Sequence, residues 1–376
     1  MRERALPDFP WDSLAGPAAV ARQHPDGIVD LSVGTPVDPT PELIAAALAA
    51  AADAPGYPPT QGTAALRRAV VDWFARRRGV VGLDPAAVLP SVGSKELVAL
   101  LPSLLALGPG DVVAHPRIAY PTYDVGARLA GATPLAADPA NLPAALGDRP
   151  LRLVWVNSPA NPTGEVLGVD TLTRLVAWAR ERGAIVASDE CYAELCFGTG
   201  SAPSILDPRV ADGSTRGLLA LYSLSKQSSI AGYRAAFVAG DRDLIDRLLA
   251  VRKHAGLMVP APVQAAMIAA LGDDRHVDAQ RERYRARRDL LLGAVSAAGL
   301  VNDGGDAGLY LWLRAADRPG TTSSELVDAF AGRGVLVAPG TFYSAGADGY
   351  VRVALTATDE RVRAAGERLS GGRLFP

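Results

Sequence analysis

The stretch that decides the fold is LLALYSLSKQSSIAGYR, residues 218–234. Its first five residues, Leu218–Tyr222, are continuously apolar, which is typical of a strand in a sheet covered by helices on both faces. Two serines and a lysine follow this strand, and Arg234 comes eight residues after Lys226. Only three of the 38 basic residues in the chain are lysines, so a lysine at the end of a buried strand needs an explanation. Lysine can form an imine, whereas the guanidinium of arginine stays protonated and cannot.

Outward from this strand, helical and strand patterns alternate from about Pro41 to about Leu271. The strand patterns are short apolar runs bounded by turn residues, and the helical patterns are amphipathic. This alternation predicts an α/β fold with a large, doubly wound, mixed or parallel sheet. The expected strands are Val112–Ala114, Leu153–Val156, Ile185–Ala187, Leu218–Tyr222 and Ala235–Ala239, and the expected helices include Ala64–Arg78, Lys95–Leu107 and Asp170–Arg182.

After about Asp278 the pattern changes to a long Arg-rich helix at Gln280–Leu292, followed by short strands and one helix. This part predicts a small α+β domain, against which the Pro-rich N-terminal segment is expected to pack. We therefore expect a large domain of residues 41–277 and a small domain that combines residues 1–40 and 278–376. The expected elements of the small domain are strands at Leu309–Leu313, Leu336–Ala338 and Val351–Ala354 and a helix at Glu325–Ala331.

Composition and charge argue against several classes of protein. Apolar residues make up 49% and charged residues 21% of the chain, an ordinary mixture for a globular enzyme. A net charge of -2 offers no basic surface for nucleic acid or for a membrane. The longest apolar stretches, Leu43–Ala52 and Leu97–Leu107, are shorter than the ~20 residues of a membrane span, and no secretory signal is visible, so we expect a cytoplasmic protein. Cys191 and Cys196 match neither a zinc site nor a disulfide framework, and we expect reduced thiols and no metal.

Polar side chains follow three of the expected strands at their carboxyl ends. Asn161 follows the first of them, and Asp189 and Tyr192 follow the second. Lys226 follows the third, with Arg234 soon after it. Ligands of an open α/β sheet bind beyond the carboxyl ends of its strands. We therefore expect an amide, a carboxylate, a phenol, an amine and a guanidinium to meet at one edge of the sheet.

These are the groups that pyridoxal 5′-phosphate requires. A carboxylate, here Asp189, keeps the ring nitrogen protonated so that the ring can act as an electron sink. Asn161 and Tyr192 can donate hydrogen bonds to the ring oxygen. Lys226 needs cationic or apolar neighbours so that its amine can lose a proton. The phosphate needs backbone N–H groups at a helix start, hydroxyls and a guanidinium, and the residues that fit this description are Gly93, Ser94, Lys95, Ser223, Ser225 and Arg234.

The run Ser-Leu-Ser-Lys-x7-Arg, with Asn-Pro-Thr-Gly upstream and Asp-x-x-Tyr between them, resembles the fold-type I aminotransferases of class I and II over almost the whole chain. The resemblance implies a ping-pong transaminase that carries its cofactor as a Schiff base on Lys226. In this family the freed lysine moves a proton between the substrate Cα and the cofactor. The resemblance also assigns catalytic roles to Asp189 and Tyr192, and a place in the cofactor and substrate site to Asn161.

Four further roles follow from the same resemblance. Tyr120 matches the aromatic residue that stacks on the cofactor ring. Tyr57 matches the tyrosine that reaches the phosphate from the other subunit, which implies a homodimer. Gly34 matches the glycine that closes over the substrate, and Arg352 matches the arginine that binds the substrate α-carboxylate. The implied partners are therefore small amino acids and 2-oxo acids, with no nucleic acid and no membrane.

The segments at residues 6–12, 24–36, 252–262 and 354–361 are similar to those of actinobacterial N-succinyldiaminopimelate aminotransferases. This similarity implies transfer between N-succinyl-LL-2,6-diaminopimelate and 2-oxoglutarate, in diaminopimelate and lysine biosynthesis. Both substrates carry more than one carboxylate, so a second cation beside Arg352 is expected. The candidates are Lys95, Arg22, Arg252 and Lys253.

Other functions stay open on the same pattern. Transamination of aspartate, an aromatic amino acid or a secondary metabolite would use the same cofactor residues, and so would a C–S lyase. A regulatory module that binds pyridoxal phosphate is a different class. The absence of a basic helical module before the α/β part argues against that class.

Overall fold

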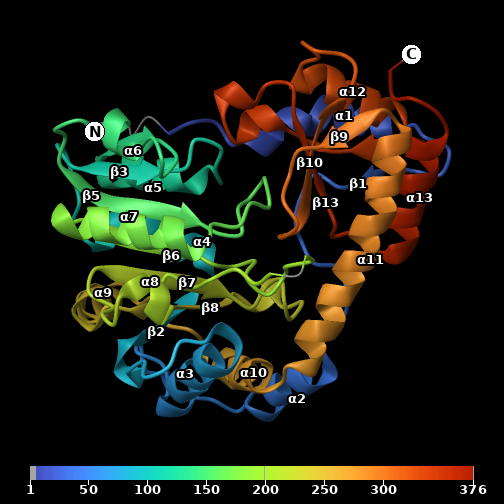
Figure 1. Cartoon of the computed structure of the whole chain (residues 1–376). Coiled ribbons are helices and arrows are strands. Elements are labelled where there is room, and N and C mark those ends of the chain that lie inside the picture. The colour runs from blue at the N-terminus through green and yellow to red at the C-terminus, as the bar shows by residue number, and fades with distance from the viewer. Residues whose placement is uncertain (1–5, 199, 376) are drawn as a thin grey trace, which may run out of the picture.

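The computed structural model describes residues 6–198 and 200–375. A seven-stranded sheet with helices on both faces forms the larger part of the molecule (Figure 1). β8 alone runs antiparallel to its neighbours β7 and β2, and the other adjacent pairs are parallel. The predicted doubly wound, mixed sheet is therefore confirmed. In spatial order its strands are β2 (Val88–Val92), β8 (Ala235–Gly240), β7 (Leu218–Ser223), β6 (Ile185–Asp189), β5 (Leu151–Asn157), β3 (Val112–His115) and β4 (Thr133–Ala136).

The strands bury both of their faces because their residues are apolar on both sides. In β7, Ala220 and Tyr222 pack into one core, and Leu219 and Leu221 pack into the other. Helices α3 (Ala64–Arg78), α7 (Val169–Glu181) and α10 (Ala261–Gly272) contribute to the first core. Helices α4 (Ser94–Leu104), α5 (Thr122–Ala130) and α9 (Arg242–Ala255) contribute to the second. The remaining helices of this part are α2 (Glu42–Ala50), α6 (Leu142–Leu146) and α8 (Pro208–Ala211).

The smaller part is built around an antiparallel sheet in the order β12-β13-β10-β9. A short parallel pair, β1 with β11, ties the N-terminal segment to this part. Helix α11 extends from the large sheet region into the small one (Figure 1). The strands are β1 (Val29–Asp30), β9 (Leu300–Asn302), β10 (Tyr310–Ala315), β11 (Val335–Leu336), β12 (Ala338–Pro339) and β13 (Val351–Ala354), and the helices are α1 (Ala15–Ala21), α11 (Arg275–Ala297), α12 (Ser323–Gly332) and α13 (Asp359–Ser370). Short 3-10 helices occur at Pro10–Leu14, Pro85–Ala87, Ala231–Tyr233, Gly340–Phe342 and Ala345–Ala347.

Three differences from the expected elements have physical causes. β2 and β4 were not among the expected strands, and each contains a proline, Pro90 or Pro134. Both are edge strands, where a missing N–H is tolerated. The single strand expected at Leu336–Ala338 is two strands, since β11 pairs with β1 whereas β12 pairs with β13. The division into domains at residue 277 remains a proposal.

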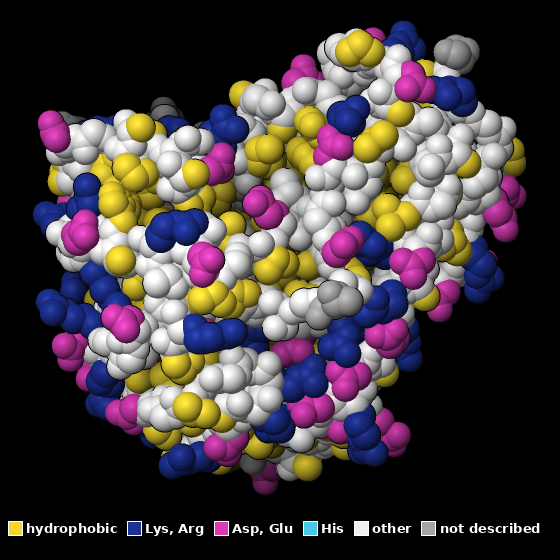
Figure 2. Space-filling model, viewed as in Figure 1, with side chains coloured by type: hydrophobic (Ala, Val, Ile, Leu, Met, Phe, Trp, Pro, Cys, Tyr) yellow, Lys and Arg dark blue, Asp and Glu magenta, His cyan; other side chains and the backbone are white. Residues whose placement is uncertain are grey.

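Charged side chains of both signs are interspersed over the face in Figure 2, and a notch separates the two parts at its upper edge. None of the described helices combines the length and the apolarity that a membrane crossing requires.

Candidate active site

The reversed direction of β8 brings Arg234 to the same edge as Lys226. Ser223, near the end of β7, pairs with Ala236 near the start of β8. The end of β2 lies beside the same start, and the Gly93 N–H donates to the Arg234 carbonyl at 2.8 Å. Gly93 has a φ of +75°, and a Cβ there would lie 2.1 Å from the Arg234 guanidinium. A glycine is therefore required for the backbone and for the room that the guanidinium occupies.

A cavity of about 440 Å³ opens at this edge, between the large sheet and the small one. Of the predicted site residues, Gly93 and Tyr57 do not line it. Gly93 lies behind Arg234, and the Tyr57 side chain is 96% exposed in this single chain. The predicted residues that line the cavity are Gly34, Ser94, Lys95, Tyr120, Asn161, Asp189, Tyr192, Ser223, Ser225, Lys226, Arg234 and Arg352.

Asp189 is a buried carboxylate without a cation beside it in the described part of the chain. It accepts hydrogen bonds from the Tyr123 hydroxyl at 2.8 Å and from the Cys191 N–H at 3.2 Å. Burial raises the pKa of Asp189, and these hydrogen bonds oppose that shift only in part. A positively charged N–H bound in the cavity would stabilise the ionised carboxylate. The protonated ring nitrogen of pyridoxal phosphate is a group of this kind.

Arg352 is a buried guanidinium in a comparable position. Its terminal nitrogens donate to the Asn161 Oδ1 at 3.1 Å and to the Ser32 carbonyl at 2.6 Å. Its Nε has no hydrogen-bond partner, and the guanidinium carbon lies 3.9 Å from the centre of the Tyr310 ring. Among the described residues no carboxylate pairs with it. The arrangement suits a carboxylate ligand, which a guanidinium binds with two parallel hydrogen bonds.

Lys226 is partly buried, and its Nζ donates to the Gly34 carbonyl at 2.5 Å. Burial lowers the pKa of Lys226, and the nearby charges of Arg352 and Arg234 lower it further, against the opposing effect of Tyr310 and Cys191. The amine can therefore be neutral under conditions in which an exposed lysine is charged. A neutral amine is the form that reacts with an aldehyde.

The same cavity also offers an anion site. Helix α4 begins after Gly93 with no side chain capping its first N–H groups. The Ser223 hydroxyl donates to Ser225 Oγ at 2.8 Å, and both hydroxyls line the cavity with Arg234. A helix start, hydroxyls and a guanidinium together suit a phosphate. The cavity therefore has groups for the phosphate, the ring nitrogen and the aldehyde of pyridoxal phosphate.

The structure also brings in residues that were not predicted from the sequence. Tyr123 donates to Asp189, and Tyr310 lies between the Tyr192 hydroxyl, 3.2 Å away, and Arg352. The register of the small sheet could have identified Tyr310, because Trp312 pairs with Arg352 and residues two apart share a face. Unpredicted residues that line the cavity include Phe9, Trp11, Tyr123, Asn157, Cys191 and Tyr310.

The chain matches known proteins over most of its length. A family model described as aminotransferase class I and II matches residues 26–369. The chain is 59% identical over 367 residues to a probable aminotransferase of Mycobacterium tuberculosis, covering 97% of this chain and 86% of that protein. It is 54% identical over 368 residues to the 4-dedimethylamino-4-oxo-anhydrotetracycline transaminase of Streptomyces rimosus, covering 98% and 100%. A solved structure of an aspartate aminotransferase double mutant of Thermus thermophilus superimposes with a TM-score of 0.87 at 27% identity, covering 98% and 99%.

Proposed function

This chain belongs to the class I and II aminotransferases and is a pyridoxal 5′-phosphate-dependent transaminase of fold type I, and from this premise we propose the roles of its residues and its substrates. The cofactor, when bound, supplies the electron sink that allows a proton to leave the substrate Cα. Lys226 would hold its aldehyde, and Asp189 its ring nitrogen. Asn161 and Tyr192 would hold its ring oxygen, and Tyr120 would stack on the ring. The residues that would hold its phosphate are Gly93, Ser94, Ser223, Ser225 and Arg234.

The protein groups then divide the work of amino transfer. Arg352 binds the substrate carboxylate and so directs the Cα–H bond toward Lys226. Lys226 Nζ, whose pKa is lowered mainly by burial, takes the Cα proton and returns it on the product side. The Gly34 carbonyl, which accepts a hydrogen bond from Nζ, belongs to the segment that encloses this region. The first substrate leaves as a 2-oxo acid, and a second 2-oxo acid receives the amino group in reverse order.

The substrate proposal depends on a second cation in the same cavity. Lys95 lines the cavity, with its Nζ 5.6 Å from the centre of the Phe9 ring. Arg252 is buried and pairs with Glu96 at 2.7 Å, which leaves it unavailable to a ligand. The other two candidates, Arg22 and Lys253, are exposed and lie outside the cavity. The cavity therefore contains two cations, Arg352 and Lys95, that can bind a substrate with two carboxylates.

We infer that the amino donor is N-succinyl-LL-2,6-diaminopimelate and the acceptor 2-oxoglutarate, on the route to diaminopimelate and lysine. Each of these substrates carries the second carboxylate that Lys95 can bind. The chain is also 33% identical over 389 residues to an LL-diaminopimelate aminotransferase of Aquifex aeolicus, covering 99% of this chain and 98% of that protein. By its name, that relative acts on LL-diaminopimelate, a compound closely related to the proposed amino donor.

A second candidate is an aromatic ketone of secondary metabolism. The Streptomyces rimosus relative is named for such a substrate, an oxo-anhydrotetracycline. The aromatic side chains of Phe9 and Trp11 on the cavity wall favour a flat, bulky substrate as well. Glutamate would serve as the amino donor for this ketone, whereas in the first candidate reaction glutamate is the product formed from 2-oxoglutarate.

A half-reaction experiment distinguishes these candidates. Glutamate and N-succinyldiaminopimelate are expected to bleach the visible absorbance of the yellow holoenzyme. Lys95→Met should raise the concentration of each that gives half-bleaching by about tenfold, because one ion pair with the substrate is lost. Alanine, which has a single carboxylate, is the matched control and should be unaffected by the substitution. Lys226→Ala should abolish bleaching by every donor.

Different outcomes would overturn different parts of the proposal. Bleaching by glutamate but not by the succinylated donor, with amination of a polycyclic ketone, would favour the second candidate. Release of pyruvate without consumption of a 2-oxo acid would indicate a C–S lyase. Bleaching that Lys226→Ala leaves intact would contradict the assignment of the lysine.

We also propose that the chain acts as a homodimer. Tyr57 is the most exposed of the large hydrophobic residues in the described structure and does not line the cavity of its own chain. A second copy of the chain that covered this ring would remove its apolar surface from water. The exposure of Tyr57 supports its proposed contact with the phosphate in the neighbouring site.

A further inference from the structure

One face of α11 carries four polar side chains where a core helix would carry apolar ones. They are His276, Gln280, Tyr284 and Arg287. Because they lie at intervals of four, four and three residues, they share one side of the helix. All four are buried or nearly buried, although much of the rest of α11 is exposed. We call them the α11 stripe. A buried polar row of this kind needs partners, and its partners identify what it does.

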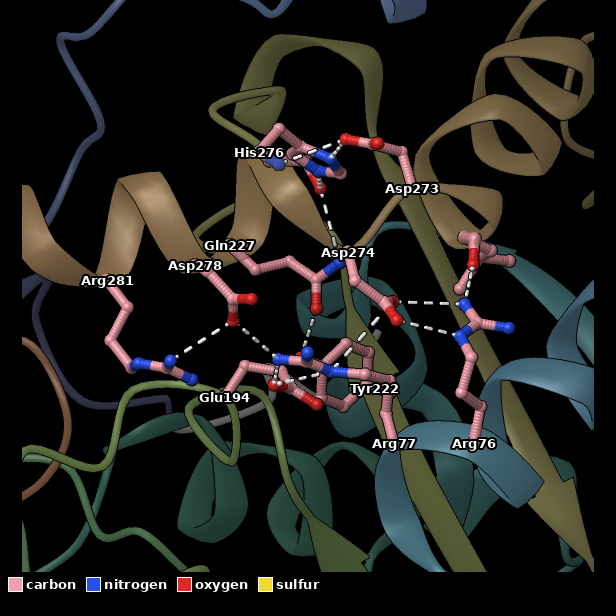
Figure 3. Close-up of polar contacts among 12 residues, drawn as sticks. Arg76, Arg77, Glu194, Tyr222, Gln227, Asp273, Asp274, His276, Asp278 and Arg281 are labelled. Atoms are coloured by element: carbon pink, nitrogen blue, oxygen red, sulfur yellow. Dashed lines mark hydrogen bonds and ion pairs between the residues drawn. The ribbon is translucent and has the colours of Figure 1, made fainter.

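The first partner is the segment that follows Lys226. The Ser228 hydroxyl lies 2.8 Å from His276 Nε2, and His276 Nδ1 lies 2.9 Å from Asp273 Oδ2. On the other side, Gln227 Nε2 donates to Ser228 Oγ at 3.2 Å, and the Tyr222 hydroxyl donates to Gln227 Oε1 at 2.5 Å. Figure 3 shows this row of contacts from Tyr222 to Asp273. It starts in β7 and ends at the beginning of α11.

Along the whole of this row, each hydrogen-bond donor can face an acceptor. The pKa of Asp273 is lowered to about 2, chiefly by the hydrogen bond that it accepts from the backbone N–H of His276. Asp273 therefore accepts as a carboxylate. An accepting carboxylate places the imidazole proton on Nδ1 and leaves Nε2 as an acceptor. Ser228 can then donate to Nε2 while it accepts from Gln227. Each contact in the row then joins one donor to one acceptor, which favours one rigid arrangement.

The other three residues of the α11 stripe contact the surroundings of Lys226 at two more points. The Tyr284 hydroxyl donates to the Lys226 carbonyl at 3.5 Å. Gln280 Nε2 donates to Asp38 Oδ2 at 2.7 Å, and Arg287 pairs with the same carboxylate. Asp38 lies four residues after Gly34, whose carbonyl accepts from the lysine Nζ. The stripe therefore contacts both segments that enclose the lysine.

The segment after the lysine also has a backbone that needs support. Ser229 has a φ of +53°, a conformation that favours glycine and costs about 1 kcal/mol or more for other residues. Its hydroxyl donates to the Asp38 carbonyl at 2.6 Å, and its own carbonyl accepts from the Thr40 hydroxyl at 3.2 Å. Such a conformation persists only where neighbouring contacts hold it.

The Asp273–His276–Ser228 set has the residue types of a serine nucleophile site, but its surroundings argue against that role. Ser228 is 1% exposed, and it does not line the candidate active-site cavity. No substrate can reach its hydroxyl. The set acts on the fold instead.

We propose that the α11 stripe positions Lys226, by fixing residues 227–229 and Asp38 while the lysine side chain stays free to move. This proposal rests on the proposed role of Lys226. The side chain has to alternate between the cofactor and the substrate proton, and both positions depend on where its Cα lies. Because α11 also carries the small sheet, the stripe ties the lysine to the part of the protein that provides Arg352. His276, Gln280, Tyr284 and Arg287 are thus positioning residues.

Ser228→Ala tests this proposal in the holoenzyme, since it removes the central hydroxyl and leaves Gln227 and His276 without it. We expect kcat to fall about ten- to hundredfold with little change in KM for the amino donor, because Arg352 is untouched. The midpoint of the pH titration of the visible absorbance should shift by about half a unit or more, as the lysine environment changes. The dissociation constant of the cofactor should rise.

Asp278→Ala is the matched control. Asp278 lies in the same turn of α11 but on another side, where it pairs with Arg77 and Arg281 (Figure 3). It should lower the melting temperature without moving the absorbance midpoint, the cofactor affinity or kcat. His276→Gln is a second variant if Ser228→Ala fails to fold. The double variant Ser228→Ala/His276→Gln should be no worse than the poorer single variant, because both interrupt one row.

The proposal is overturned if Ser228→Ala and His276→Gln behave like Asp278→Ala in all three readouts. It is also overturned if their effects on kcat simply multiply. Failure of the proposed function looks different, since Lys226→Ala would then still be bleached by glutamate.

Discussion

Two consecutive buried carboxylates at the end of β6 face opposite environments. Glu190 pairs with Arg78 at 3.3 Å and accepts from the Ser204 hydroxyl at 3.0 Å and from the Ile205 N–H at 2.7 Å. Asp189, the residue before it, faces the cavity, and no cation among the described residues pairs with it. A buried charge is costly unless it is paired. Glu190 finds its partner within the chain, whereas Asp189 leaves that position to a ligand.

Two buried arginines repeat the contrast. Arg252 is fully enclosed and pairs with Glu96. Arg352 is 2% exposed, and it contacts an amide, a backbone carbonyl and aromatic rings but no carboxylate among the described residues. The comparison separates charges that hold the fold from charges that await a substrate or cofactor. Substitutions can test that separation.

The largest difference is expected between Asp189→Asn and Glu190→Gln. Asp189→Asn should reduce kcat/KM about 10³-fold, because a charge aimed at the reacting system is removed. It should leave the melting temperature of the cofactor-free protein unchanged or higher, since an unpaired buried charge disappears. Glu190→Gln should lower the free energy of unfolding by about 3 kcal/mol, because Arg78 loses its partner. Steady-state kinetics of the holoenzymes measure the change in kcat/KM, and unfolding of the cofactor-free proteins measures the change in stability. Equal loss of stability in the two variants would refute the contrast.

A smaller difference is expected between Arg352→Met and Arg252→Met. Arg352→Met should reduce kcat/KM for amino acids about 10²-fold through loss of the carboxylate contact. Arg252→Met should mainly reduce stability, because it leaves Glu96 buried and unpaired. Steady-state kinetics with glutamate and denaturant unfolding separate the two effects. If Arg252→Met weakens substrate binding as strongly as Arg352→Met, the distinction between the two arginines is wrong.

The smallest effect concerns pH. Burial raises the pKa of Asp189 above its ordinary value of 3.8, so the folded, cofactor-free protein binds a proton more tightly than the unfolded chain. Stability from this residue is therefore full below pH 3.8 and is lost as pH rises through the folded-state value. Burial also raises the pKa of Glu190, so Glu190 adds its own pH dependence to the stability of both proteins. Subtracting the melting temperature of one protein from that of the other removes this shared contribution. The melting temperature of Asp189→Asn minus that of the unchanged protein should increase from pH 4 upward, and a constant difference would contradict the prediction.

Much of the site could be predicted because its residues lie next to strands in the sequence. Asn161, Asp189 and Lys226 each follow an apolar run, and the parallel arrangement brings the ends of such runs together. Tyr310 and Tyr123 could not be found this way. Tyr310 reaches the cavity through the register of a strand pair, and Tyr123 through its contact with Asp189 across the sheet end.

The α11 stripe illustrates a second limit. The sequence of this helix shows an Arg-rich surface, which favours a solvated helix and hides the four residues that face inward. Their partners, Ser228 and Asp38, are 48 and 242 residues away from His276 and Gln280, respectively. Such pairings depend on tertiary packing and leave no periodic signal in one sequence.

The antiparallel course of β8 has a consequence for how this protein can change over time. Lys226 and Arg234 stand at the two sides of a single loop between β7 and β8, with seven residues between them. The distance between these two proposed cofactor contacts is thus set by the length of that loop. Insertions there would misfit the cofactor, so new specificities have to arise from the N-terminal segment and the small sheet, where Trp11 and Tyr310 form the opposite wall.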